Sequence, residues 1–141
     1  ATAELRALNT DLLSRGQEAE GNYIRGLLAD ATNKPEDAIR WFDLASSSGD
    51  RRARALSEFA KTEMMLNRKL INTSQAIERL DSLRFAWRGG PFEFNLLRRL
   101  GELQFAVGDL RSGITTFRQI VKYFPKSPEM PLLSKQMSDE F

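Results

Sequence analysis

The chain has 141 residues, of which 41% are hydrophobic and 28% are charged, and its net charge is +2, as expected for one soluble folded domain. It has no cysteine and no histidine, which excludes disulfides, thiolate or imidazole metal ligands, cysteine nucleophiles and imidazole bases. No apolar run approaches the roughly 18 residues that a membrane helix needs, so no membrane insertion is expected. Absence of cysteine slightly favours an exported bacterial protein, and a start at Ala1 indicates a processed product or a piece of a longer chain.

Helical periodicity runs through almost every segment, and no stretch alternates over the length of a strand. Residues 1–18 are expected to form a first helix that weakens near Gly16. A second helix is expected over about 18–31. Its apolar positions are Tyr23, Ile24, Leu27 and Leu28. The third helix is expected over about 35–46, because Pro35 suits a first helical position.

A fourth helix is expected over about 51–66, followed by a fifth that ends near Arg88. Thr73 or Ser74 is the expected cap of the fifth helix. Its apolar residues fall at spacings of four, three and four, which is one face of one helix. They are Ala76, Leu80, Leu83 and Trp87. Arginines among aromatic residues, as in "LRFAWRGGPFEF", occur both on surfaces that stack on nucleotide bases and at corners between two helices. This face predicts that Trp87 points inward, which favours the corner.

Two glycines and a proline separate this corner from the helices of the last third of the chain. A sixth helix is expected over about 91–107 and a seventh over about 109–123, with Gly108 between them. The segment 128–141 also has apolar residues at helical spacing, and we expect it to form a C-terminal capping helix or tail.

The helices pair at a regular spacing of about 34 residues. Two glycines precede a small residue and then a phenylalanine with identical separations: Gly26, Ala38 and Phe42 in one case, Gly101, Gly113 and Phe117 in the other. Ala60 lies one repeat length after Gly26, and Ala76 and Leu80 follow it after a turn that is longer than in the other pairs. Small residues in both helices allow their backbones to approach closely, with the aromatic ring filling the space behind them.

This pattern resembles the tetratricopeptide repeat family. The last unit carries "LGELQFAVGDLRSGITTFRQIVKYFP", which is similar to the family's leucine-glycine pair, glycine-aspartate turn, small position, aromatic position and terminal proline. The resemblance implies an all-α fold of antiparallel helix-turn-helix pairs, stacked as a right-handed superhelix. About three degenerate pairs are expected, over 19–52, 53–93 and 94–127. The structural motif residues are Gly26, Ala38, Phe42, Ala45, Ala60, Ala76, Leu80, Gly101, Gly113, Phe117 and Pro125.

The resemblance implies a non-enzymatic protein–protein interaction or scaffold module, in which the first helix of each pair lines a concave groove for a peptide or a partner helix. Projected onto this chain, the groove positions are Tyr23, Leu27, Asp30, Arg54, Ser57, Glu58, Lys61, Met64, Asn95, Arg98, Arg99, Glu102 and Phe105. No carboxylate pair or acidic cluster stands out, so neither enzymatic activity nor a metal or cofactor is expected. A second copy of the chain or neighbouring repeats of a longer protein are further expected partners.

Two alternatives remain open. Residues 51–126 carry 15 Lys and Arg against 7 Asp and Glu, a net charge of +8 that would suit nucleic acid or another polyanion. The equivalent positions Tyr23, Ser57 and Arg98 share no chemistry, so a repeat that reads successive bases is disfavoured and nucleic acid is not the expected partner. The other alternative is a purely structural segment of a longer solenoid.

Overall fold

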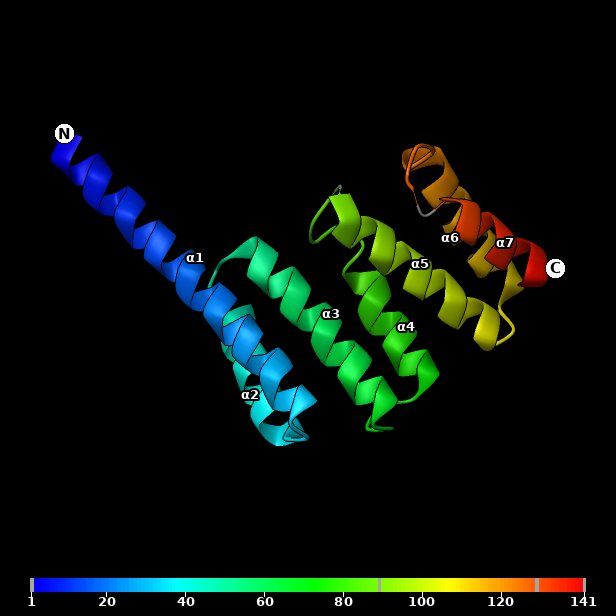
Figure 1. Cartoon of the computed structure of the whole chain (residues 1–141), viewed down its shortest axis with the longest axis horizontal. Coiled ribbons are helices and arrows are strands. Elements are labelled where there is room, and N and C mark those ends of the chain that lie inside the picture. The colour runs from blue at the N-terminus through cyan, green and yellow to red at the C-terminus, as the bar shows by residue number, and fades with distance from the viewer. Residues whose placement is uncertain (1, 89, 129, 141) are drawn as a thin grey trace. The chain divides into compact units, whose positions relative to one another are not determined.

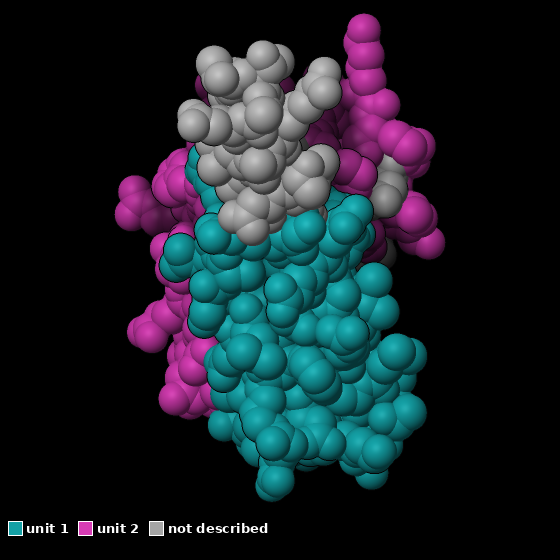
Figure 2. Space-filling view, turned by 90° about the vertical axis from the view of Figure 1, so that its left-hand side faces the viewer, with its two compact units in different colours: residues 1–70 teal, residues 71–141 magenta. Residues whose placement is uncertain are grey.

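A computed structural model describes the backbone of residues 2–88, 90–128 and 130–140, and the side chains of residues 14–88, 90–128, 130–136 and 138. The described residues form seven helices and no strand, so the expected all-α class is confirmed (Figure 1). The chain divides into two compact units, residues 1–70 and 71–141, coloured separately in Figure 2. The border between them falls inside the middle predicted pair, 53–93.

Unit 1 consists of α1 (Thr2–Ala31), α2 (Pro35–Ser46) and α3 (Arg51–Asn67), each packed against the other two. The sequence predicted two helices in place of α1, and the break expected near Gly16 is absent. A glycine inside a helix costs only about 1 kcal/mol relative to alanine, which the neighbouring helical turns outweigh. A Cβ atom at Gly16 would lie 3.1 Å from the Asp50 carboxylate, so the glycine also gives this N-cap residue of α3 room. The side chains of residues 2–13, which include the apolar residues of the expected first helix, lie outside the described residues.

The buried face of α1 consists of small residues. Burial is complete or nearly so at Ala19, Asn22, Gly26 and Ala29. The larger residues Ile24, Leu27 and Leu28 are 48%, 40% and 60% exposed. The reason is the close approach of α2: a Cβ atom at Gly26 would lie 2.5 Å from the ring of Phe42. Large side chains on this face would push the two helices apart.

The core of unit 1 forms around the Phe42 ring, which is 1% exposed. The cluster of buried residues is Ala29, Ala38, Phe42 and Met64, with Tyr23, Ile39, Trp41, Ala60 and Met65 packed against it. Tyr23 and Phe42 lie with their ring centroids 6.3 Å apart. All three helices therefore contribute to one apolar interior.

Unit 2 consists of α4 (Thr73–Ser82), α5 (Gly90–Ala106), α6 (Leu110–Tyr123) and α7 (Met130–Glu140). The cap of α4 is Asn72, one residue before the expected Thr73 or Ser74. Its side chain accepts a 2.8 Å hydrogen bond from the backbone amide of Gln75, and the Gln75 side chain accepts one from the amide of Asn72. This reciprocal capping box satisfies two amides that the first turn would otherwise leave without partners.

The end of α4 corrects a second prediction, because the helix stops at Ser82 and does not reach Arg88. The following amides bond three residues back, from Leu83 to Leu80 and from Arg84 to Asp81, which tightens the last turn. Leu80 and Leu83 stay buried, but the changed winding turns Trp87 away from their face, and it is 37% exposed.

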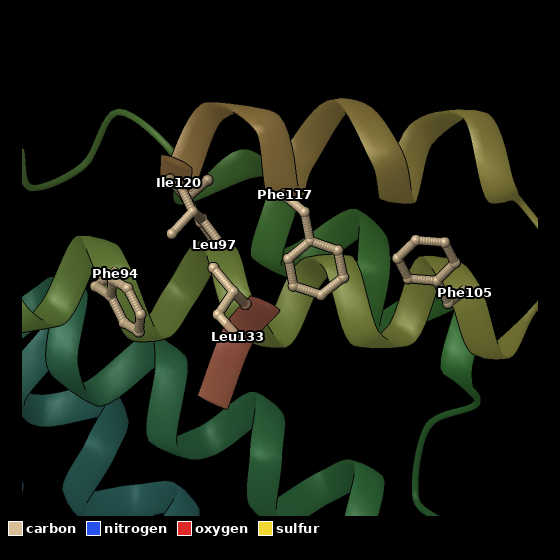
Figure 3. Close-up of a cluster of buried hydrophobic side chains, with 6 residues drawn as sticks. All are labelled: Phe94, Leu97, Phe105, Phe117, Ile120 and Leu133. Atoms are coloured by element: carbon tan, nitrogen blue, oxygen red, sulfur yellow. The ribbon is translucent and has the colours of Figure 1, made fainter. Parts of the chain in front are cut away.

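The core of unit 2 is a cluster of six buried residues drawn in Figure 3: Phe94, Leu97, Phe105, Phe117, Ile120 and Leu133. The rings of Phe105 and Phe117 stack with their centroids 5.3 Å apart. A Cβ atom at Gly101 would lie 3.1 Å from Phe117, and one at Gly113 would lie 3.0 Å from Phe105, so both glycines face a ring. Leu133 of α7 is 1% exposed and belongs to the cluster, which holds this last helix against α5 and α6.

Candidate functional site

Three of the groove positions predicted in unit 1 are engaged within the unit. Tyr23 is half-buried against Phe42, and this burial raises the pKa of its hydroxyl above the ordinary value of 10.0, with the nearby Arg52 acting in the opposite direction. Asp30 pairs with Arg68 at 2.8 Å, and Lys61 pairs with Asp43 of α2 at 2.7 Å. Their charged groups are therefore already satisfied by partners in the same unit.

Arg68, at the C-cap of α3, is the residue of this site that the sequence did not single out. Two of its nitrogens donate to Asp30 Oδ1, at 2.8 and 3.2 Å, and Nη2 also donates to the backbone carbonyl of Asp30 at 3.0 Å. Nη1 donates to the side chain of Asn33 at 2.8 Å. This fork joins the end of α1 to the end of α3, a geometry that arginine provides and lysine does not.

The predicted groove positions of unit 2 form a charged group on one face of α5. Arg98 and Arg99 each lie 3.3 Å from a carboxylate oxygen of Glu102. Glu102 therefore pairs with both arginines. Asn95, one turn earlier, is exposed.

The remaining groove positions differ in exposure. Ser57, Met64 and Phe105 are buried, at 0%, 2% and 7%, and belong to the interior, so their placement on a groove surface was wrong. Arg54 is exposed and Glu58 is half-buried on α3. Leu27 is the one large apolar side chain among the predicted groove positions that is exposed.

Leu27 lies in a continuous apolar patch on α1 that we call the α1 stripe: Ile24, Leu27 and Leu28. The three residues stand at i, i+3 and i+4, which makes them neighbours on the helix surface. Ile24 and Leu28 stand two residues before and after Gly26, which turns each about 160° away from it. The α1 stripe therefore faces away from the buried side of α1. It is the candidate interaction surface of unit 1.

The described residues hold no group of three or more metal-ligating side chains placed to share an ion. Within the same residues, every helix is too short or too polar to cross a bilayer. Among the surface features of the described residues, exposed apolar patches are the kind that can mark interaction sites.

Comparison with protein-family models, with curated proteins and with solved structures gives no match to this chain. The resemblance to tetratricopeptide repeats therefore stays a prediction from the residues.

Proposed function

We propose that the chain is a non-enzymatic helical-repeat module that binds another protein, and that the α1 stripe is where the partner docks. The observation that carries the proposal is the exposure of Ile24, Leu27 and Leu28 on one face of a helix whose opposite face is fully packed. Contiguous exposed apolar side chains on a folded protein mark interaction surfaces. A partner helix or extended segment with its own apolar residues fits such a face.

The α1 stripe is too small to form a complete interface, so it would be the central apolar part of a larger one. Full burial of one such side chain stabilises by about 1.5–3 kcal/mol, and these three are already about half buried. Covering them therefore contributes roughly 2–5 kcal/mol, against association costs of at least about 4 kcal/mol. Flanking contacts must supply the rest.

One contact that recurs in both units links the proposal to the repeat architecture. The glycine-to-phenylalanine contact occurs in unit 1 between Gly26 and Phe42 and in unit 2 between Gly101 and Phe117, and the two pairs have the same separation in sequence. A helix pair of this kind buries one face and leaves another for the next repeat or a ligand. The right-handed tetratricopeptide superhelix is part of this proposal.

The test is affinity capture from lysate of the source cells with three immobilised chains. They are the wild type, the stripe variant Ile24→Ala/Leu28→Ala, and a matched control with two other exposed leucines changed, Leu44→Ala/Leu132→Ala. Alanine keeps the helices intact because it has the highest helix propensity. We expect at least one protein to bind the wild type and the control equally and the stripe variant at least tenfold less.

Circular dichroism of the three chains should show equal helicity, which separates lost docking from lost folding. The proposal is wrong if every captured protein binds the stripe variant as well as it binds the wild type. It is equally wrong if the control variant loses the same proteins to the same extent.

A further inference from the structure

The segment after α4 presents an arginine-bound aromatic ring on the surface of unit 2. Phe85 is 69% exposed, the most exposed of the large apolar side chains that the structure describes. The guanidinium carbons of Arg84 and Arg88 lie 5.9 and 5.3 Å from its ring centroid. Both distances are within the range of cation–π attraction. Arg84 also lies 3.3 Å from Asp81 and Arg88 lies 3.5 Å from Glu93, so part of the charge of each arginine is neutralised.

Helix α6 carries a row of exposed cations. Arg111, Arg118 and Lys122 are all exposed and stand at i, i+7 and i+11, on one side of the helix. The helix itself contains no aspartate or glutamate. In the part of the chain that the structure describes, no carboxylate pairs with Arg111 or Arg118. The row spans about 16 Å, at 1.5 Å per residue.

A direct contact joins these two features into one surface of unit 2. Arg84 donates a hydrogen bond to the side chain of Gln119, on the flank of α6. Lys122 and Tyr123 follow Gln119 by three and four residues, so they are its neighbours on the helix. Tyr123 is 53% exposed, and the Lys122 ammonium lies 5.6 Å from its ring centroid. We call this surface the basic-aromatic face: Arg84, Phe85, Arg88, Arg118, Lys122 and Tyr123.

We propose that unit 2 binds a single strand of RNA or DNA across the basic-aromatic face. The free cations of α6 would contact phosphates, and Phe85 and Tyr123 would stack with bases. Cations beside exposed rings are how proteins hold single strands without reading their sequence. A row of about 16 Å is long enough to contact several phosphates of one strand.

Single-stranded nucleic acid fits this face better than an acidic peptide or an anionic membrane. An acidic peptide would use the cations of α6 and leave the exposed ring of Phe85 unused. Insertion into a membrane would require apolar side chains that project clear of polar groups, but Phe85 has two guanidinium groups at 5.9 and 5.3 Å from its ring centroid. A strand of alternating phosphates and flat bases uses both kinds of group.

The test is fluorescence anisotropy with labelled 20-nucleotide oligo(dT) and oligo(U), titrated with the chain from about 50 to 200 mM salt. The charge variant is Arg118→Gln/Lys122→Gln. Its matched control, Arg51→Gln/Lys34→Gln, removes one arginine and one lysine that are exposed in unit 1. The stacking variant is Phe85→Ala/Tyr123→Ala, which changes two exposed side chains and leaves the core intact.

We expect the charge variant to bind more weakly and its salt slope to fall by roughly 1.4, since each phosphate contact on a single strand contributes about 0.7. The control variant should match the wild type. The stacking variant should lose about fivefold or more per stacked base with an unchanged salt slope.

Several results would overturn the proposal. Absence of binding at about 50 mM salt would do so, because phosphate contacts are strongest there. The proposal would also be wrong if a 20-base-pair duplex bound as tightly as the single strands and the stacking variant had no effect. Charge would then be the only source of affinity. Binding of a polyglutamate peptide or of phosphatidylserine vesicles without binding of either oligonucleotide would assign the face to another partner. None of these results depends on the α1 stripe, so they leave the proposed protein docking untouched.

Discussion

Replacing Gly26 by alanine tests the close packing of α1 on α2. The new methyl carbon would lie 2.5 and 2.6 Å from two atoms of the Phe42 ring. The ring cannot move away easily, because Phe42 is 1% exposed and sits at the centre of the unit 1 core. Alanine would therefore overpack this contact.

Two opposing effects set the magnitude. Overpacking a core costs about 1–3 kcal/mol, and replacing a glycine inside a helix by alanine stabilises by about 1 kcal/mol. Since two ring atoms lie closer than 3.0 Å to the new methyl carbon, we take the upper part of the overpacking range. Subtracting the gain in helix propensity from that cost leaves an expected net loss of about 1–2 kcal/mol.

Gly21→Ala is the matched control on the same helix. A Cβ atom there would meet only the end of the Arg25 side chain, at 3.7 Å. We expect this variant to gain about 0.5–1 kcal/mol from helix propensity alone. The two glycine-to-alanine changes should therefore differ by roughly 2–3 kcal/mol, with opposite signs.

Urea unfolding measures the difference directly. The chain has two tryptophans, Trp41 in unit 1 and Trp87 in unit 2. In a Trp87→Phe background the fluorescence reports unit 1 alone. A lower midpoint with an unchanged m-value is the expected result for Gly26→Ala. Equal stabilisation by Gly26→Ala and Gly21→Ala would refute the packing argument.

Phe42→Leu should cost less stability in the Gly26→Ala background than in the wild type, because the smaller side chain relieves the clash.

Three further predictions concern other contacts. Burial raises the folded-state pKa of Tyr23 above 10.0. Its neutral hydroxyl therefore contributes fully to stability below pH 10.0, and this contribution is lost as the pH rises through the folded-state pKa. Tyr23→Phe should flatten the dependence of the unfolding free energy on pH between about pH 9 and 11. Arg68→Ala leaves the half-buried Asp30 without its cation and should destabilise unit 1 by about 1–2 kcal/mol in urea unfolding, with Arg68→Lys recovering only part of it. Asn72→Ala removes the cap of α4 and should cost about 1 kcal/mol, measured by the unfolding of unit 2, whereas Asn72→Ser should cost little.

The all-α class and most helix boundaries were predictable from the sequence because the signals for these are local. Pro35 begins α2, and Asp109 caps α6 through a hydrogen bond from the amide of Ser112. The sequence separation between Gly26 and Phe42 predicts that the phenylalanine ring packs on the glycine of the neighbouring helix, and this contact is present.

The candidate surfaces could not be predicted in the same way, because exposure depends on which face of a helix meets its neighbour. Leu28 and Ala29 are adjacent in sequence, and only the close approach of α2 decides that the small one is buried and the large one exposed. Trp87 fits the periodicity of α4, but the tightened turn at Leu83 ends that periodicity before reaching it. Arg68 lies in a connection, and because its partner Asp30 is distant in sequence, their pairing leaves no local signal.

Photo-crosslinking from the α1 stripe is the most direct test of the proposed function. A photoreactive amino acid placed at position 28 samples the most exposed residue of the stripe, and one placed at position 132, which is as exposed, samples a surface outside it. After irradiation in the source cells, we predict a protein adduct from position 28 that is missing from position 132. Adducts from position 132 alone, or identical adducts from both positions, would contradict docking on the α1 stripe.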